Sequence, residues 1–468
     1  MENKNKRLAK KSLIYFIGNL SSKILNFLLV PIYAYTISST DLGNYDYIIT
    51  LASIIIPIVY MVLWEAILKF SLSQKATIRR ITTTTSIFTI ILNIIIIPIM
   101  YIVFQYFYNI GVNAIYIVGI FVLYGLTNIW QYYARALKYE KVYVFSSIIA
   151  TISNLIMNII FICVLKMGFI GLAISYIVSN VIAIVVIEFK VKIISSIKLE
   201  DFDAKLLKNM IIFSAPLVLN TVSAWLLSGA SRIIIINKLG SNANGIYTFA
   251  NKFSVIVTLI GSVINMAFVE ESIINSKSEN VDNDFLKTVE FLLEKFLSLL
   301  ILAIPTINIF YYMITSTEYY ESKLYFPFLL IYSLFSVMAT NIGTIFHVIN
   351  KTKYAFFTTI LGTIVFFLVA IIGIDKFGLI CISNAQILGA FVIFISRYIY
   401  AKKYCRQGFD WKKIAIMLFF YIAISILCYN ANLISNIIVF MILLVMISYT
   451  NKNIIINLYN KIVKKTDL

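Results

Sequence analysis

Long apolar segments recur along the whole chain and are separated by short polar connections. Most of them contain at least 18 residues, enough for a helix to cross a hydrocarbon core of about 30 Å. We place fourteen, near 12–37, 46–68, 81–106, 112–134, 142–165, 168–189, 210–237, 246–269, 291–314, 324–347, 354–374, 377–396, 414–429 and 432–450. The pattern predicts an all-α integral membrane protein, because a β-barrel would show short segments of alternating polarity.

The composition agrees with a chain that lies mostly in a membrane. Hydrophobic residues make up 61% of the 468 residues and charged residues 13%, whereas soluble proteins carry about 25% charged residues. The first segment is too long for a signal peptide, and no small-residue cleavage site follows it, so we expect it to remain. Four scattered cysteines show no spacing typical of a zinc site or a disulfide framework.

The basic residues predict the orientation. If the segments alternate from a cytoplasmic N-terminus, 30 of the 39 Lys and Arg residues lie in the tails and even-numbered loops, and four lie in odd-numbered loops. Positive residues stay on the cytoplasmic side of membrane proteins. We therefore predict a multi-pass protein of the bacterial cytoplasmic membrane with both termini inside. The net charge of +18 reflects topology and attraction to membrane lipid, and we expect no nucleic-acid partner.

An internal repeat predicts two similar halves. The stretch "ISSTDLGNYDY" (37–47) aligns with "LGSNANGIYTF" (239–249) at an offset of 202 residues, which pairs Gly43 with Gly245 and Tyr45 with Tyr247. Parallel repeats are a known transporter plan. We expect an N-lobe of six spans (1–189), a cytoplasmic linker with an amphipathic helix (190–209), a C-lobe of six spans (210–396), and two further spans with a basic tail (397–468).

The basic start "KRLAKKSLIYFIGNLSSKILNFLLVPIYAYTIS", the turn "STDLGNYDY", its echo "LGSNANGIYTFANKFS" and the fourteen segments carry a resemblance. Together they resemble the Wzx-type polysaccharide flippases of the superfamily that also holds multidrug exporters and lipid II flippases. The resemblance implies two lobes around a central cavity lined by the first, second, seventh and eighth spans. It also implies an undecaprenyl-diphosphate-linked oligosaccharide as substrate, and a polysaccharide polymerase and other biosynthesis proteins as partners.

A lysine at the middle of the first segment is the leading candidate for substrate binding. Lys23 shares one helical face with Asn19 and Asn26, and a charged group at the bilayer centre costs about 2.5–3.5 kcal/mol on insertion scales. One interpretation is a cation that lines an anion-binding cavity, because ammonium and guanidinium groups give charge-assisted hydrogen bonds to phosphate oxygens. The alternative is a polar contact between helices.

Other polar residues extend this candidate cavity. The seventh segment carries Thr221, Ser228 and Arg232 on one face, and the eighth carries Asn251, Thr258 and, at the edge of the stripe, Lys252. Arg232 lies near the outer end, so its alternative is snorkelling to the interface. Candidates for a gate or for coupling to an ion lie at the cytoplasmic ends of spans: Glu65, Lys69, Glu270 and Glu271. Glu65 and Lys69 are spaced for a local i, i+4 ion pair.

The sequence argues against two other classes of protein. No glycine directly precedes a lysine, so the chain lacks the phosphate loop of an ATP-driven pump. We expect no cofactor, and any energy to come from an ion gradient or the membrane potential. A glycosyltransferase or polymerase is disfavoured because the Asp-x-Asp motif at 201–203 lies in a short loop. A drug exporter remains the closer alternative, although the candidate cavity residues are mostly basic.

Overall fold

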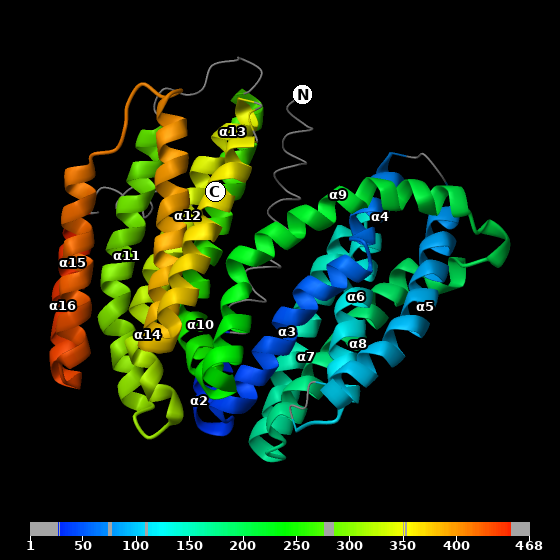
Figure 1. Cartoon of the computed structure of the whole chain (residues 1–468), viewed down its shortest axis with the longest axis horizontal. Helices are drawn as coiled ribbons and strands as arrows, with labels where there is room; N and C mark the ends of the chain where they lie inside the picture. Colours follow the sequence, from blue (N-terminus) through cyan, green and yellow to red (C-terminus); the bar gives the residue numbers. More distant parts are fainter. Residues whose placement is uncertain are drawn as a thin grey trace, which may run out of the picture. The chain divides into compact units, whose positions relative to one another are not determined.

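The computed structural model describes residues 27, 29–73, 77–107, 111–275, 285–349, 351 and 353–450. These residues are almost entirely helical and contain no strand. The chain divides into two compact units, Met1–Thr248 and Phe249–Leu468, and Figure 1 shows their helices. The boundary falls within helix α10.

Among the described residues, unit 1 holds eight α-helices and the beginning of a ninth. They are α2 (Leu29–Thr36), α3 (Ser39–Val59), α4 (Leu63–Leu72), α5 (Ile78–Ile102), α6 (Ala114–Ala136), α7 (Glu140–Asn158), α8 (Gly168–Val191), α9 (Ala204–Ser228) and the start of α10 (Ala230–Asn275). Short π-helical turns, Val103–Phe107 and Ile159–Val164, continue α5 and α7. Gly240, with a φ of 87°, interrupts α10.

Unit 2 holds the rest of α10 and the C-terminal helices. They are α11 (Phe285–Met313), the 3₁₀ segment η6 (Glu318–Leu324), α12 (Phe326–Gly343), α13 (Ile345–Val348), α14 (Lys353–Lys402), α15 (Trp411–Asn430) and α16 (Leu433–Thr450). Gly378, with a φ of 56°, interrupts α14. Gly240 lies between the predicted seventh and eighth segments, and Gly378 lies at the second residue of the predicted twelfth segment, four residues after the predicted eleventh ends.

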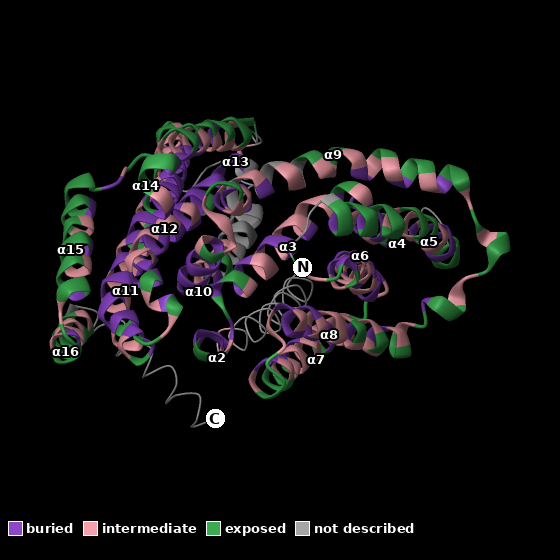
Figure 2. Ribbon diagram, turned by 60° about the horizontal axis from the view of Figure 1, so that its bottom comes forward, coloured by how far each residue is buried: buried purple, intermediate pink, exposed green. Residues whose placement is uncertain are grey.

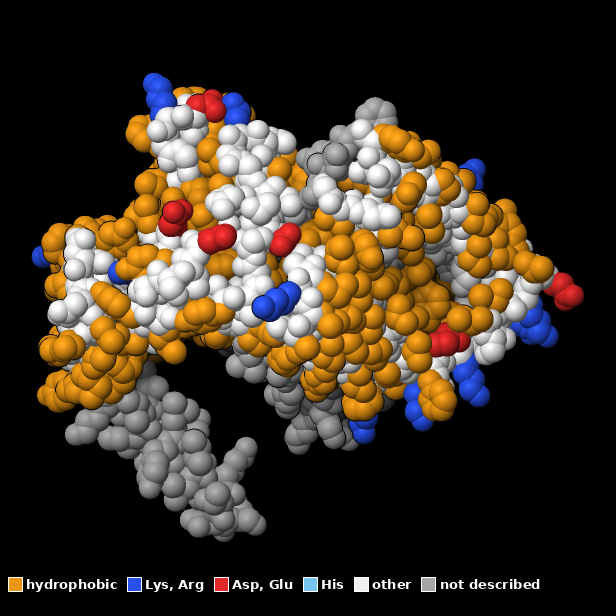
Figure 3. Space-filling model, turned by 90° about the horizontal axis from the view of Figure 1, so that it is seen from below, with side chains coloured by type: hydrophobic (Ala, Val, Ile, Leu, Met, Phe, Trp, Pro, Cys, Tyr) orange, Lys and Arg blue, Asp and Glu red, His pale blue; other side chains and the backbone are white. Residues whose placement is uncertain are grey.

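The helices have the length and composition of membrane spans. Nine helices within the described residues are long and apolar enough to cross a bilayer, with the interrupted α14 counted once. Figure 3 shows one face on which hydrophobic side chains cover broad areas. The protein is therefore an all-α, multi-pass membrane protein, and the count of fourteen spans stays a prediction.

Each unit is held by its own apolar core, shown by burial in Figure 2. In unit 1 the fully buried rings of Tyr60, Phe121 and Tyr133 belong to one cluster from α3 to α9. In unit 2 the central helix is α12, of which 72% is buried. The rings of Tyr311 and Phe326 stack there at 5.5 Å.

The predicted amphipathic helix in the linker is wrong. Between α8 and α9 the chain makes only two short 3₁₀ turns, Ile194–Ser196 and Leu199–Asp201. Tertiary contacts explain this, because the linker is tied to the first turns of α5. The backbone amides of Lys198 and Asp203 donate to the hydroxyls of Thr83 and Thr84, and Arg79 pairs with Asp201 at 2.7 Å.

The α15–α16 hairpin is attached at both ends to other helices of unit 2. At one end Lys413 pairs with Glu294 of α11 at 2.7 Å, and the Asp410 amide donates to Glu290. At the other end Lys323 of η6 donates to the Tyr429 carbonyl at 2.9 Å. Only 3% of Lys323 is exposed, and the rings of Tyr312, Tyr320 and Tyr429 surround its ammonium group at 5.1–5.6 Å.

Candidate functional site

Two glycines at repeat-related positions meet inside unit 1. A Cβ on Gly43 of α3 would lie 1.9 Å from the Ser241 carbonyl oxygen, and a Cβ on Gly245 of α10 would lie 1.8 Å from the Ser39 carbonyl oxygen. The two serines are separated by 202 residues, as are the two glycines, so the contact is symmetrical in the repeat. Only glycine permits backbones to approach so closely.

Side-chain amides from α10 reinforce this approach. Asn242 donates to the Ser39 hydroxyl at 2.6 Å, and the buried Asn244 donates to the Gly43 carbonyl at 2.8 Å. Together these residues form what we call the repeat contact: Ser39, Gly43, Ser241, Asn242, Asn244 and Gly245. It combines close backbone packing with interhelical hydrogen bonds, the two interactions that hold membrane helices together.

Arg232 lies next to the repeat contact and faces an acidic residue of α3. Its Nε is 3.4 Å from Oδ2 of Asp46, and only 12% of its side chain is exposed. The guanidinium also lies over the Tyr247 ring at 5.2 Å. Among the described residues Oδ2 of Asp46 accepts no hydrogen bond, so the ion pair compensates its charge. Arg232 therefore packs against the protein and does not snorkel away from it.

Trp225 links α9 to the middle of α3 by hydrogen bonds. Its indole Nε1 donates to the Thr50 carbonyl at 3.1 Å and to the Ser53 hydroxyl at 3.0 Å. Gly229, which separates α9 from α10, packs against the same indole, and a Cβ there would lie 2.5 Å from it. The predicted seventh span is thus broken beside an anchored tryptophan.

The predicted second span is also broken. Between α3 and α4, Met61 and Val62 have φ values of 51° and 48°, in the left-handed region that a β-branched residue such as valine rarely adopts. Such strain costs about 1–3 kcal/mol per residue and clusters at functional sites. The Tyr60 hydroxyl donates to Oδ1 of Asn93 of α5 at 2.9 Å and holds the end of the break.

The predicted ion pair between Glu65 and Lys69 is wrong. Glu65 accepts a hydrogen bond of 2.6 Å from the Tyr132 hydroxyl, while Lys69 lies 3.7 Å from the centre of the Phe213 ring. A local i, i+4 pair contributes only about 0.2–0.5 kcal/mol. A hydrogen bond to a charged group contributes about 1.5–3 kcal/mol, so the tertiary partner is preferred.

The remaining predicted site residues are only partly placed. Lys23, Asn19 and Asn26 lie outside the described residues, as do the side chains of Ser228, Glu270 and Glu271. In unit 1 the Thr221 hydroxyl donates to the Leu217 carbonyl of its own helix. In unit 2 Asn251 accepts from Ser254, Thr258 donates to Val255, and Lys252 is half-buried nearby. Their role in a common cavity stays a prediction.

The Asp-x-Asp motif has a structural role. Asp201 pairs with Arg79, and Asp203 accepts from the Leu206 amide at 2.9 Å as the N-cap of α9. Within the part of the chain that the structure describes, no group of three His, Cys, Asp or Glu residues could hold a metal ion.

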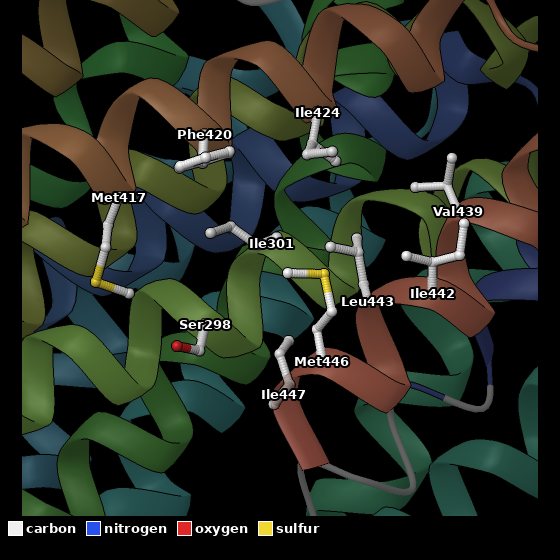
Figure 4. Close-up of a pocket in the computed structure, with 10 residues that line it drawn as sticks. All are labelled: Ser298, Ile301, Met417, Phe420, Ile424, Val439, Ile442, Leu443, Met446 and Ile447. Carbon is white, nitrogen blue, oxygen red and sulfur yellow. The ribbon is translucent and has the colours of Figure 1, made fainter. Parts of the chain in front are cut away.

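Unit 2 contains an apolar pocket of about 380 Å³ between α11, α15 and α16. Figure 4 shows its lining, which is hydrophobic except for Ser298. It offers no charged group for an anion. This pocket therefore does not fit an anionic group, unlike the surroundings of Arg232 in unit 1.

Sequence reasoning missed the partners in this site. The candidates do not include Asp46, Trp225, Asn242, Asn244 and Tyr132, although Asp46 contacts Arg232 and Tyr132 contacts Glu65. Asp46 gave one usable signal, as an acidic residue at the edge of an apolar segment. The other four look like ordinary membrane-helix residues until the fold brings them to their partners.

Comparisons with known proteins agree with this architecture. The family model described as "Polysaccharide biosynthesis protein" matches residues 8–269. The solved structure of the lipid II flippase MurJ, in an inward closed conformation, is similar with a TM-score of 0.73 at 14% identity, over 94% of this chain and all of that chain. A multidrug resistance MATE family transporter of the MOP superfamily is similar in two forms. The inward-facing form gives a TM-score of 0.57 at 16% identity and covers 85% of this chain and 99% of that chain. The outward-facing form gives a TM-score of 0.56 at 15% identity and covers 88% of this chain and 96% of that chain. A search of curated proteins found no match.

Proposed function

Because the chain belongs to the polysaccharide biosynthesis protein family, we propose that it is a flippase for undecaprenyl-diphosphate-linked oligosaccharide. It moves this lipid from the cytoplasmic to the outer leaflet of the bacterial cytoplasmic membrane by alternating access, with both termini in the cytoplasm. The likeness in fold to a lipid II flippase and to multidrug transporters supports a transporter. The charged residues among the cavity candidates, Lys23, Arg232 and Lys252, are all basic, which favours an anionic substrate.

The observation that carries the proposal is a nearly buried arginine between two membrane helices. Arg232 pairs with Asp46 at 3.4 Å, a distance longer than a strong charge-assisted hydrogen bond of about 2.7–2.9 Å. A diphosphate offers more oxygens and more charge than one carboxylate. In the proposed mechanism Lys23 holds the diphosphate first, and Arg232 exchanges Asp46 for it later. Asn19, Asn26, Thr221, Ser228, Asn251, Lys252 and Thr258 supply hydrogen bonds to sugars and phosphate.

The repeat contact is the proposed gate on the outer side. It joins the connections that follow the first and seventh predicted segments, which the charge distribution places outside. While Gly43 and Gly245 are packed against the facing serine carbonyls, these connections cannot separate. Transport requires them to part, so that Arg232 and its bound anion reach the outer leaflet.

Glu65 is the proposed coupling group. It follows the strained break at Met61 and Val62 and accepts a hydrogen bond from Tyr132, whose ring lies 4.6 Å from the guanidinium carbon of Arg135. In this proposal, loss of the hydrogen bond from Tyr132 frees the strained break to change its conformation. Lys69, Glu270 and Glu271 belong to the same cytoplasmic gate in this proposal.

The second candidate is a multidrug exporter, which the likeness to MATE transporters supports. Such a protein needs acidic groups available to cationic drugs. Asp46 and Glu65 are both acidic, but Asp46 faces Arg232 and Glu65 accepts from Tyr132. Both carboxylates thus already have partners in the protein, which favours the anionic substrate.

The proposal is tested with purified protein in sealed vesicles that contain the lipid-linked oligosaccharide. A glycosidase added outside cleaves the glycan in the outer leaflet only. We expect the protein to make the whole pool accessible to the glycosidase, and we expect the glycan from matched vesicles without glycosidase to be recovered intact. Recovery of a product with a new glycosidic bond would instead indicate a polymerase or transferase.

A further inference from the structure

A groove on unit 1, away from the proposed transport site, carries a lysine on each side. It lies between α7 and α8, has a volume of about 490 Å³, and is lined by Lys141, Val142, Phe145, Val185, Val186, Phe189 and Lys190. Helices α7 and α8 pack side by side in Figures 1 and 2. Because α7 begins at Glu140 and α8 ends at Val191, both lysines lie at the same end of this antiparallel pair.

The walls of the groove are apolar and open to the surroundings. Phe189 is 76% exposed, and Phe145 and Val185 are each more than half exposed. Phe145 lies one helical turn, about 6 Å, beyond Lys141. An apolar chain that enters between the helices would therefore run along these side chains, while the lysines remain at the helix ends, where lipid head groups lie.

The two lysines have no acidic partner in the groove, although the ammonium group of Lys190 lies 5.7 Å from the centre of the Phe189 ring. Neither Lys141 nor Lys190 forms an ion pair within the described part of the chain, and no lining residue is acidic. The nearby Glu188 is occupied, since Trp130 donates to one of its oxygens at 3.0 Å and the Ile194 amide to the other at 2.8 Å. An anion between the two ammonium groups would complete the site.

We propose that this groove binds one anionic phospholipid, with its phosphate between Lys141 and Lys190 and an acyl chain along the α7–α8 walls. A neutral lipid would not neutralise the charges of the two lysines, and inorganic phosphate would not cover the apolar walls. A second copy of the chain in a two-fold contact would bring an identical pair of lysines against this one. The predicted orientation places the groove in the cytoplasmic leaflet, where anionic lipids attract basic residues.

The test counts lipids bound to the purified full-length protein by native mass spectrometry. The protein is titrated with phosphatidylglycerol and, separately, with phosphatidylcholine of the same acyl chains. Each lysine near an anionic head group changes affinity about fivefold. We therefore expect the first phosphatidylglycerol to bind about 25-fold more tightly than the first phosphatidylcholine. Equal affinities would overturn the proposal without any variant.

Variants assign this difference to the groove. Lys141→Ala with Lys190→Ala should remove the preference for phosphatidylglycerol, and Lys141→Arg with Lys190→Arg should keep it. The matched control is Lys205→Ala with Lys208→Ala, two exposed lysines of α9 in the same unit, which should keep the preference. Val185→Trp fills the groove and should weaken both lipids. The site would be contradicted if the control variant lost the preference for phosphatidylglycerol to the same extent. It would also be contradicted if inorganic phosphate released the bound phosphatidylglycerol, or if the protein formed a dimer that the lysine variants dissociate.

Discussion

Adding one methyl group to Gly43 should open the repeat contact. A Cβ at this position would lie 1.9 Å from the Ser241 carbonyl oxygen, whereas ordinary contacts begin at 3.4 Å. The two backbones must therefore separate by about 1.5 Å, the difference between these distances. Overpacking of this kind costs about 1–3 kcal/mol, and the cost falls on the closed arrangement alone. This corresponds to about a 5- to 150-fold shift toward the open arrangement.

A disulfide measures how often the contact is closed. The Ser39 hydroxyl and the Asn242 amide are 2.6 Å apart, so Ser39→Cys with Asn242→Cys, in a chain without its four native cysteines, should cross-link under mild oxidation and stop transport until a reductant is added. Adding Gly43→Ala should slow the cross-linking at least fivefold.

Gly119→Ala is the control for this experiment. A Cβ there would lie 2.8 Å from Cδ1 of Ile177, the end of a flexible side chain, which can move aside. It should leave the cross-linking rate unchanged. If Gly43→Ala and Gly119→Ala cross-link at the parent rate, the close approach of Gly43 does not hold the contact, and the reasoning fails.

Three further predictions address charged groups. Lys23→Ala should abolish glycan export at normal protein abundance while Lys23→Arg retains part of it, and near-normal export from Lys23→Ala would remove this residue from the site. Asp46→Asn and Arg232→Gln should each lower the melting temperature. A double-mutant cycle of the two should give a coupling energy of about 1–3 kcal/mol. Additive effects would mean that the ion pair at 3.4 Å does not stabilise the protein. Burial lowers the pKa of Lys323 in the folded state. Between this lowered pKa and the ordinary value of about 10.4, the folded state binds fewer protons at Lys323 than the unfolded state. The free energy of unfolding that this group contributes should therefore rise as the pH rises through this interval. The stability of the parent relative to Lys323→Met should therefore increase over this interval, and a constant difference would show that Lys323 does not titrate as proposed.

The sequence predicted the features of this fold that repeat or are periodic. Apolar segments located the helices, and the 202-residue offset identified Gly43 and Gly245 as equivalent positions before the structure placed them in contact. The contact itself was not predictable, because two equivalent positions need not meet. The ends of the seventh and eleventh segments were well placed, since Gly240 and Gly378 supply the φ values that such reversals need.

Tertiary contacts account for the predictions that were wrong. The alternation of apolar and charged residues in the linker predicts a helix, but Arg79, Thr83 and Thr84 of α5 hold the linker in short turns. The spacing of Glu65 and Lys69 predicts a local ion pair, but Tyr132 is a stronger partner for Glu65. The pairing of Asp46 with Arg232 has no local signal, because Arg232 lies 186 residues further along the chain. In each case a residue distant in the sequence determines the structure, and the local sequence pattern does not indicate that residue.

We propose that this protein carries an anionic lipid-linked glycan, and a comparison of two substrates in the same kind of vesicle tests this proposal most directly. Purified protein is reconstituted with either a labelled undecaprenyl-diphosphate-linked oligosaccharide or a fluorescent cationic drug, and movement across the bilayer is followed with and without an imposed ion gradient. We predict that the protein moves the lipid-linked glycan and not the drug, and that Arg232→Gln abolishes this movement while the protein stays folded. Movement of the cationic drug, with none of the glycan, would contradict the account and identify the protein as a drug exporter.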